Sequence, residues 1–160
     1  MKGLSSLERI ILEGLGKQTM VYEEILNQTG LQENVCFNVL QALVIRSLVT
    51  TDGVRYRISD RLSPLMLEEI NGTEAKQAES LEMIEAIIEQ QDKLFRFQKV
   101  AMDERDHKIF VAMLSNLESF LADANKKAKG STALKDRKVV FWGIGEVKSV
   151  MNQIVHGGQR

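Results

Sequence analysis

Few side chains in this 160-residue chain are arranged for catalysis. His107 and His156 lie far apart, and neither has the neighbouring cysteines or carboxylates that would suit a metal ion. Asp103, Glu104 and Asp106 are clustered, but they fall at the start of a predicted helix, where carboxylates cap free backbone NH groups. We therefore predict no catalytic residue, no metal site and no cofactor, and we do not expect an enzyme.

Two other features have a simple structural interpretation. Cys36 is the single cysteine, so no intrachain disulfide framework can form, and it falls on the inward stripe of a predicted helix. We expect a small buried residue there rather than a redox sensor. Gly143-x-Gly145 precedes a helix, but neither the dinucleotide fingerprint nor a P-loop lysine accompanies it. We interpret it as a strand-to-helix turn rather than a phosphate cradle.

The side chains best suited to recognition are amides and arginines in the first 60 residues. Asparagine and glutamine can bond bidentately to adenine, whereas arginines on a hairpin can reach phosphates or the minor groove. The candidate DNA contacts are Gln32, Asn34, Phe37, Asn38, Gln41, Arg55 and Arg57. For each polar side chain, ordinary solvated surface is the competing interpretation. For Phe37 it is a hydrophobic contact with the second helix or with the C-terminal region.

Three helical segments would have to position these groups. The first opens with the capping box Ser5-x-x-Glu8, and its apolar stripe is Leu4, Leu7, Ile10, Ile11 and Leu15. The second opens after Thr19, ends at Gly30, and places inward Val21, Tyr22, Ile25 and Leu26. The third runs over residues 33–46, and its inward positions are Cys36, Val39, Leu40 and Leu43.

A small hairpin is predicted directly after the third helix. Leu48 and Val49 enter the first strand, and Thr51-Asp52-Gly53 supplies a turn whose glycine tolerates positive φ. The second strand then alternates Val54, Tyr56 and Ile58 with Arg55 and Arg57. This alternation would place both arginines on the outer face.

The run Thr29-Gly30-Leu31, followed by Val35, Leu40, Leu43, Leu48-Val49 and Tyr56-Arg57-Ile58, resembles the winged-helix domains of MarR-type and related bacterial or archaeal transcription regulators. The resemblance covers residues 5–58 and implies that the third helix and the hairpin face DNA. Two departures stand out. Ser47 occupies a position where many such proteins have glycine, and Glu33 is the only ionic residue between Gln32 and Ile45.

The remaining chain is predicted to be mainly helical. Ser63-Pro64 starts a short helix, Asn71-Gly72-Thr73 breaks it, and two long helices over residues 73–99 and 103–129 are expected to form an antiparallel hairpin. A strand over 138–143 and a final helix follow, and the inward residues of that helix are Val147, Val150, Met151, Ile154 and Val155. This order loosely resembles TrmB-type regulators, without a shared sugar-binding motif, which implies dimerisation or sensing.

Charge does not by itself draw the chain to nucleic acid. The formal net charge is −1, and residues 1–62 carry seven bases and seven acids. Residues 68–92 hold eight acids and one base, whereas residues 126–148 hold seven bases and two acids. Our preferred interpretation is that these charges lie on solvated helix faces, where some acidic and basic side chains pair with one another. The alternative is that the basic tract supplies secondary phosphate contacts through Lys126, Lys127 and Lys129.

The sequence thus predicts a mainly α protein with a small β wing: a winged helix-turn-helix over residues 1–62, then a helical dimerisation or sensing region with a C-terminal strand and helix over 63–160. The expected function is a DNA-binding transcriptional regulator that forms a homodimer through the helical hairpin and acts on a palindrome-like site in double-stranded DNA. The alternative is a winged-helix protein-interaction module without DNA. The sequence leaves open whether a small-molecule effector or a protein partner also binds. With no signal peptide or long apolar run, a cytoplasmic protein without membrane contact is expected.

Overall fold

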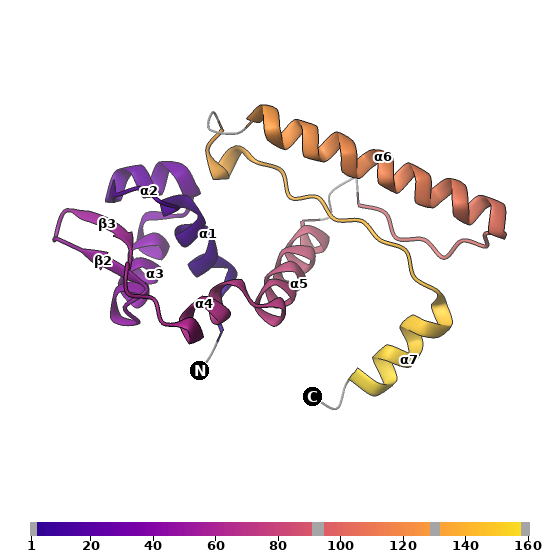
Figure 1. Ribbon diagram of the computed structural model, residues 1–160, viewed down its shortest axis with the longest axis horizontal. Coiled ribbons are helices and arrows are strands. Elements are labelled where there is room, and N and C mark those ends of the chain that lie inside the picture. The colour runs from indigo at the N-terminus through magenta and orange to yellow at the C-terminus, as the bar shows by residue number, and fades with distance from the viewer. Residues whose placement is uncertain (1–2, 91–94, 129–131, 158–160) are drawn as a thin grey trace. The chain divides into compact units, whose positions relative to one another are not determined.

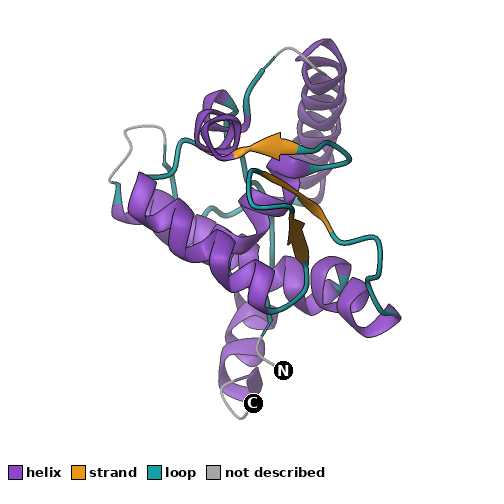
Figure 2. Cartoon of the chain, turned by 90° about the vertical axis from the view of Figure 1, so that its left-hand side faces the viewer, coloured by secondary structure: helices purple, strands orange, loops and turns teal. Residues whose placement is uncertain are grey.

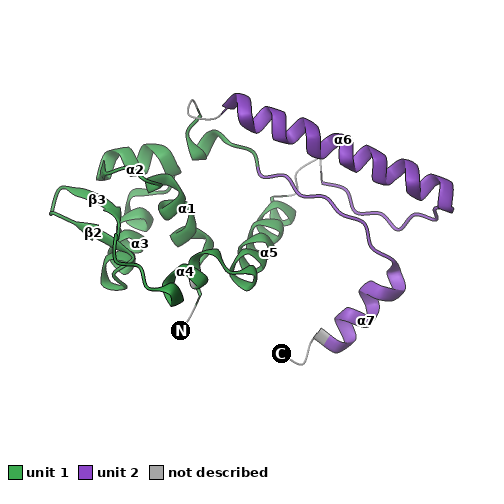
Figure 3. Ribbon diagram, viewed as in Figure 1, with its two compact units in different colours: residues 1–91, 131–138 green, residues 92–130, 139–160 purple. Residues whose placement is uncertain are grey.

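The computed structural model describes residues 3–90, 95–128 and 132–157. The chain divides into two compact units (Figure 3): unit 1 comprises residues 1–91 and 131–138, and unit 2 comprises residues 92–130 and 139–160. The described residues are mainly helical with one small antiparallel sheet (Figure 2), as the sequence predicted. None of the described helices has the length and apolar composition needed to cross a bilayer.

Three helices of unit 1 lie together (Figure 1), and their side chains form an apolar core. They are α1 (Ser6–Leu15), α2 (Tyr22–Thr29) and α3 (Glu33–Ile45), and α1 contacts both of the others. The large side chains that are less than 2 % exposed are Ile11, Leu15, Ile25, Cys36, Leu40, Leu43, Leu48 and Val49. Each buried aliphatic side chain of this size contributes roughly 1.5–3 kcal/mol to folding. This core therefore fixes which side of α3 faces outward.

The start of α1 follows the predicted capping box. The Glu8 backbone NH donates to Ser5 Oγ at 3.2 Å, and the Ser5 NH donates to Glu8 Oε2 at 2.8 Å. The predicted stripe is wrong at Leu7, which is exposed, whereas Leu12 is buried instead. Because α5 also contacts α1, the buried side of the helix is rotated toward Leu12 and Arg9.

The sheet contains one strand that the sequence analysis placed in a helix. Its strands are β1 (Met20–Val21), β2 (Val49–Thr51) and β3 (Arg55–Ile58), in the order β1-β3-β2. Val21 pairs with Arg55 in the antiparallel register, so α2 begins at Tyr22 rather than directly after Thr19. Pairing with a strand more than thirty residues away has overridden the local helical pattern here.

Gly30 ends α2, as predicted, and sets the tight turn to α3. Its φ of 69° is left-handed, and its NH donates to the Leu26 carbonyl at 2.9 Å. A Cβ at this position would also lie 2.7 Å from Lys135 Cβ. That close approach comes from the short 3-10 helix η1 (Leu134–Asp136), which packs on α2 with Lys135 Nζ 2.7 Å from Asn27 Oδ1.

Two helices complete unit 1. Helix α4 (Pro64–Asn71) begins as predicted, with Met66 NH donating to Ser63 Oγ at 3.2 Å, and Gly72 separates it from α5 (Thr73–Glu89). The buried Arg9 side chain on α1 donates from Nη1 to the Ile70 carbonyl at 2.6 Å and lies 3.7 Å from Glu79 Oε2 through Nε. A single guanidinium thus connects α1 with both helices.

The predicted helix over residues 73–99 is too long. Helix α5 ends at Glu89, and residues 95–103 are not helical. The aromatic and β-branched residues Phe95, Phe97 and Val100 lower the helix propensity of this stretch. The antiparallel hairpin stays a prediction, because α5 belongs to unit 1 and the next long helix to unit 2.

Unit 2 contains α6 (Glu104–Ala128) and α7 (Val147–Gly157). Asp103 caps α6 as expected, since its Oδ1 accepts from the Asp106 NH at 2.7 Å. The predicted strand over 138–143 is wrong: these residues form no strand, because a strand needs an edge to pair with and this stretch pairs with none of the described strands. The apolar side of α7 was expected to point inward, but the structure exposes Val147, Val150, Met151, Ile154 and Val155.

Candidate nucleic-acid interface

The outer face of α3 carries a stripe of amides. Asn34, Asn38 and Gln41 are spaced by four and three residues, so they share one side of the helix. Asn34 and Asn38 are exposed and Gln41 is half-buried, whereas Cys36, Leu40 and Leu43 are fully buried. The packed core thus holds the amide stripe at the surface of unit 1.

The amides differ in how far they are already engaged. The Asn34 Oδ1 atom accepts the Val35 NH at 2.9 Å, which leaves its NH₂ group as the available donor. Gln32 is exposed at the N-cap, where its backbone carbonyl accepts the Cys36 NH at 2.8 Å. Among the described residues, no hydrogen bond engages the carboxamide of Asn38. Asn38 therefore presents both a donor and an acceptor outward.

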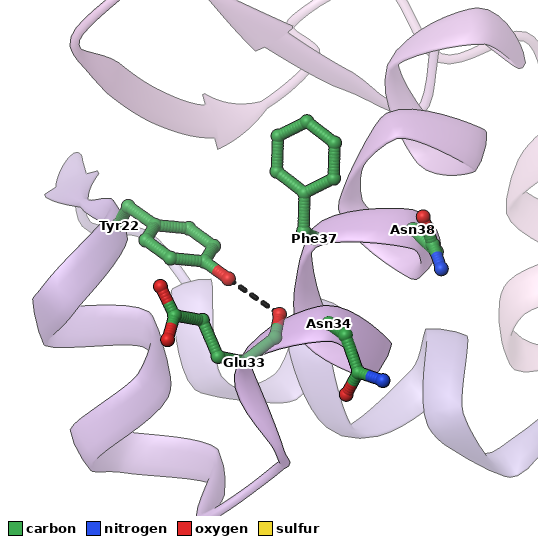
Figure 4. A pocket seen from close by; sticks show the side chains of 5 residues that line it. All are labelled: Tyr22, Glu33, Asn34, Phe37 and Asn38. Carbon is green, nitrogen blue, oxygen red and sulfur yellow. Dashed lines mark hydrogen bonds between the residues drawn. The ribbon is translucent and has the colours of Figure 1, made fainter.

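An open hollow lies beside this stripe (Figure 4). Its lining residues are Tyr22, Glu33, Asn34, Phe37 and Asn38. The Tyr22 hydroxyl donates to the Glu33 carbonyl at 2.6 Å and closes the start of α3 against α2. Burial raises the pKa of Tyr22, and the nearby Cys36 and Glu33 raise it further. Sequence reasoning placed Tyr22 only in the core and missed its position at this surface.

Phe37 meets the second helix, which was one of its two expected roles. Its ring lies edge-on to the Tyr22 ring, with centroids 6.4 Å apart at an interplanar angle of 80°. The Phe37 side chain is nevertheless 51 % exposed. It can therefore contact a ligand such as a thymine methyl group while it keeps its contact with Tyr22.

The β2–β3 turn is organised by Asp52. Its Oδ1 atom accepts backbone NH groups from Val54 at 2.9 Å and from Arg55 at 2.8 Å, and these bonds lower the pKa of the Asp52 carboxyl. Gly53 supplies the positive φ of 97° that the turn requires. The turn thereby sets the start of β3, where the exposed Arg55 lies.

The two arginines of β3 are not equivalent. Both are exposed on the outer face, as the alternation predicted. Arg57 forms an ion pair with Asp60, whereas no ion pair engages Arg55 among the residues that the structure describes. Arg55 is therefore the better candidate for a phosphate contact, and Arg57 would first have to leave Asp60.

Ser47 explains the first departure from the winged-helix pattern. Its φ is 59°, so it adopts the left-handed conformation for which glycine is the usual residue. The NH of Ser47 donates to the Val44 carbonyl at 2.9 Å, and that of Leu48 donates to the Leu43 carbonyl at 3.0 Å. Serine thus supplies the same backbone path from α3 into β2, at a conformational cost.

The other predicted contacts lie outside this surface or outside the described residues. Lys126 and Lys127 are exposed on α6, and Lys126 Nζ lies 3.7 Å from Asp123 Oδ1. Lys129 falls outside the described residues. Because α6 belongs to unit 2, a contribution of these lysines to the α3 surface stays a prediction.

Other chemistry finds little support at this surface. Among the described residues that line the hollow, Glu33 is the only charged one, and it disfavours an anionic ligand there. Burial raises the pKa of the Cys36 thiol, which disfavours the reactive thiolate. No group of histidines, cysteines or carboxylates within the described ranges is arranged to hold a metal ion.

Comparisons with known proteins assign this chain to no family. No family model, curated protein or solved structure matches this chain. A functional assignment therefore depends on the order of the elements and on the exposed side chains of α3 and β3.

Proposed function

We propose that residues 1–62 form a winged helix-turn-helix and that the protein is a DNA-binding transcriptional regulator. The order α1-β1-α2-α3-β2-β3, with β3 in the centre of the sheet, supports a winged helix. In this assignment α3 is the recognition helix and the β2–β3 hairpin is the wing. The observation that carries the proposal is the exposed amide stripe on a helix whose opposite side is fully buried.

Recognition would combine base readout with a wing contact. With α3 in the major groove, the Asn38 carboxamide can donate to N7 and at the same time accept from N6 of adenine, as a bidentate pair, and Gln41 can read a neighbouring base. Arg55 can bind a phosphate or enter the minor groove. Because α3 carries no basic residue, a single domain is only weakly attracted to the DNA phosphates. Two domains in a homodimer on a palindrome-like site would supply the missing affinity.

Fluorescence anisotropy with random and genomic duplex fragments at several salt concentrations tests this proposal. We expect Asn38→Ala to reduce discrimination between sequences by about 1–3 kcal/mol. Arg55→Ala should weaken binding to all sequences and lower the salt slope by about one. Gln77→Ala and Lys76→Ala on α5 are matched controls that should change neither quantity. Equal behaviour of all four variants would refute the assigned roles.

A second candidate function is a winged helix that binds a protein rather than DNA. Three exposed apolar side chains favour it: Phe37 and Ile45 on α3, at 51 % and 82 % exposure, and Val54 at the hairpin turn, at 67 %. The acidic Glu33 in the hollow points the same way. The absence of duplex binding even at low salt, together with an intact fold by circular dichroism, would select this alternative.

A further inference from the structure

Helix α6 carries two neighbouring apolar stripes. The first is half-buried and consists of Phe110, Leu114, Leu117 and Leu121. The second is exposed: Ile109, Met113 and Phe120 are 47 %, 62 % and 67 % accessible. A stripe of three large apolar side chains on one side of a 25-residue helix is a surface that typically marks an interaction site.

The exposed stripe has opposite charges at its two ends. At 100° per residue, Asp106, Asn116 and Lys127 fall on the same side of α6 as the three apolar residues. Arg105 and Asp123 lie at the edge of this side, and Asp123 Oδ1 is 3.7 Å from Lys126 Nζ. Asp106 lies before the stripe and Lys127 after it, while Asn116 lies near its middle. Among the described residues, no ion pair engages either Asp106 or Lys127.

We infer that α6 pairs antiparallel with α6 of a second copy of this chain, with Asn116 next to the two-fold axis. In this register, positions equally far from the centre meet, so Met113 contacts Phe120 of the other copy and Asp106 meets Lys127. Sulfur–aromatic contact and opposite charges both favour this arrangement. It deepens the proposed function, which assumes a homodimer, by naming the surface that forms it.

The charges of Asp106 and Lys127 indicate both which partner binds α6 and how it is oriented. A parallel pair would bring Asp106 against Asp106 and Lys127 against Lys127, which is repulsive. An antiparallel second copy instead offers an apolar centre, one central amide and an opposite charge at each end. A central asparagine in a helix pair is also a known device for fixing register.

Sedimentation equilibrium of the full chain, without DNA, tests the surface. The wild type should be a dimer, and Phe120→Glu should raise the dissociation constant by about a hundredfold, because two charges would be buried in the apolar centre. Val111→Glu is the matched control, since Val111 is 45 % exposed on the opposite side of α6 and should leave the dimer intact. A monomeric wild type, or equal effects of the two variants, would overturn the inference.

Charge reversal tests the orientation. Asp106→Lys and Lys127→Asp should each weaken the dimer at low salt, and the double variant should recover most of the loss. Additive losses in the double variant would overturn the antiparallel register. Because these assays contain no DNA, failure of the proposed DNA binding would leave their results unchanged. Conversely, a monomer that binds single half-sites would overturn the pairing of α6 and the homodimer, but not DNA recognition by α3.

Discussion

Helices α3 and α6 use their apolar residues differently. The shorter helix, α3, fully buries Cys36, Leu40 and Leu43, whereas the longer α6 has no buried residue among those described. A helix with one side closed by the core holds its other side at a defined surface, as recognition requires. A helix such as α6 keeps apolar side chains in water, so it gains from a partner.

The largest expected difference is in the stability lost when one leucine is truncated in α3 and one in α6. Leu40→Ala on α3 should cost about 2–5 kcal/mol of unfolding free energy, because it opens a cavity in a closed core. Leu117→Ala on α6 should cost about 1 kcal/mol, because this side chain is only half-buried. Urea denaturation followed by circular dichroism measures both. Similar losses would contradict the difference in packing.

A second comparison concerns the acidic residues near the helix starts. Glu8 completes the capping box of α1 and accepts from Arg46 Nη1 at 2.8 Å, directly after α3. Glu8→Ala should therefore cost about 1–2 kcal/mol. Glu104 at the start of α6 is paired with Lys108 at 2.7 Å on an exposed face, so Glu104→Ala should cost less than about 0.5 kcal/mol. The same denaturation assay separates them, and the reverse ranking would count against the account.

The end of α3 offers a stabilising substitution. Ser47 has a φ of 59°, which costs a non-glycine residue about 1–2 kcal/mol. Glycine removes this strain but adds freedom to the unfolded chain, so Ser47→Gly should gain about 0.5–1 kcal/mol. Ser47→Val should lose stability at the same position. A destabilised glycine variant would show that the serine is not strained.

The β2–β3 turn should respond to acid. The pKa of Asp52 is lowered in the folded state. The ionised carboxyl therefore contributes to folding stability above the ordinary carboxyl pKa, and this contribution is lost as pH falls through the lower pKa of the folded state. The Val54 and Arg55 amide signals in NMR spectra should therefore shift only in that acidic range, and Asp52→Ala should remove the transition. A transition that persists in the variant would have another origin.

Local signals predicted much of unit 1. Periodicity located α3 and its buried side, Gly30 marked the turn before it, and Ser63-Pro64 marked the start of α4. These features depend on neighbouring residues only. The exposed amides followed from the same periodicity, because the buried stripe determines which residues point away from it.

The features that were missed depend on distant contacts. Strand β1 has two residues and exists through its pairing with β3, and η1 is held by contacts with α2. The apolar stretch 138–143 has strand-like composition but pairs with no sheet edge in the described chain. Neither pairing nor its absence can be read from local composition.

The most direct test of the central claim is an NMR titration of the labelled full chain with a duplex selected from random sequences. We predict that the amide signals of α3 around Asn38 and those of the β2–β3 hairpin around Arg55 shift first and saturate together. Binding of the duplex without shifts at α3, or no binding at low salt, would contradict recognition by this helix.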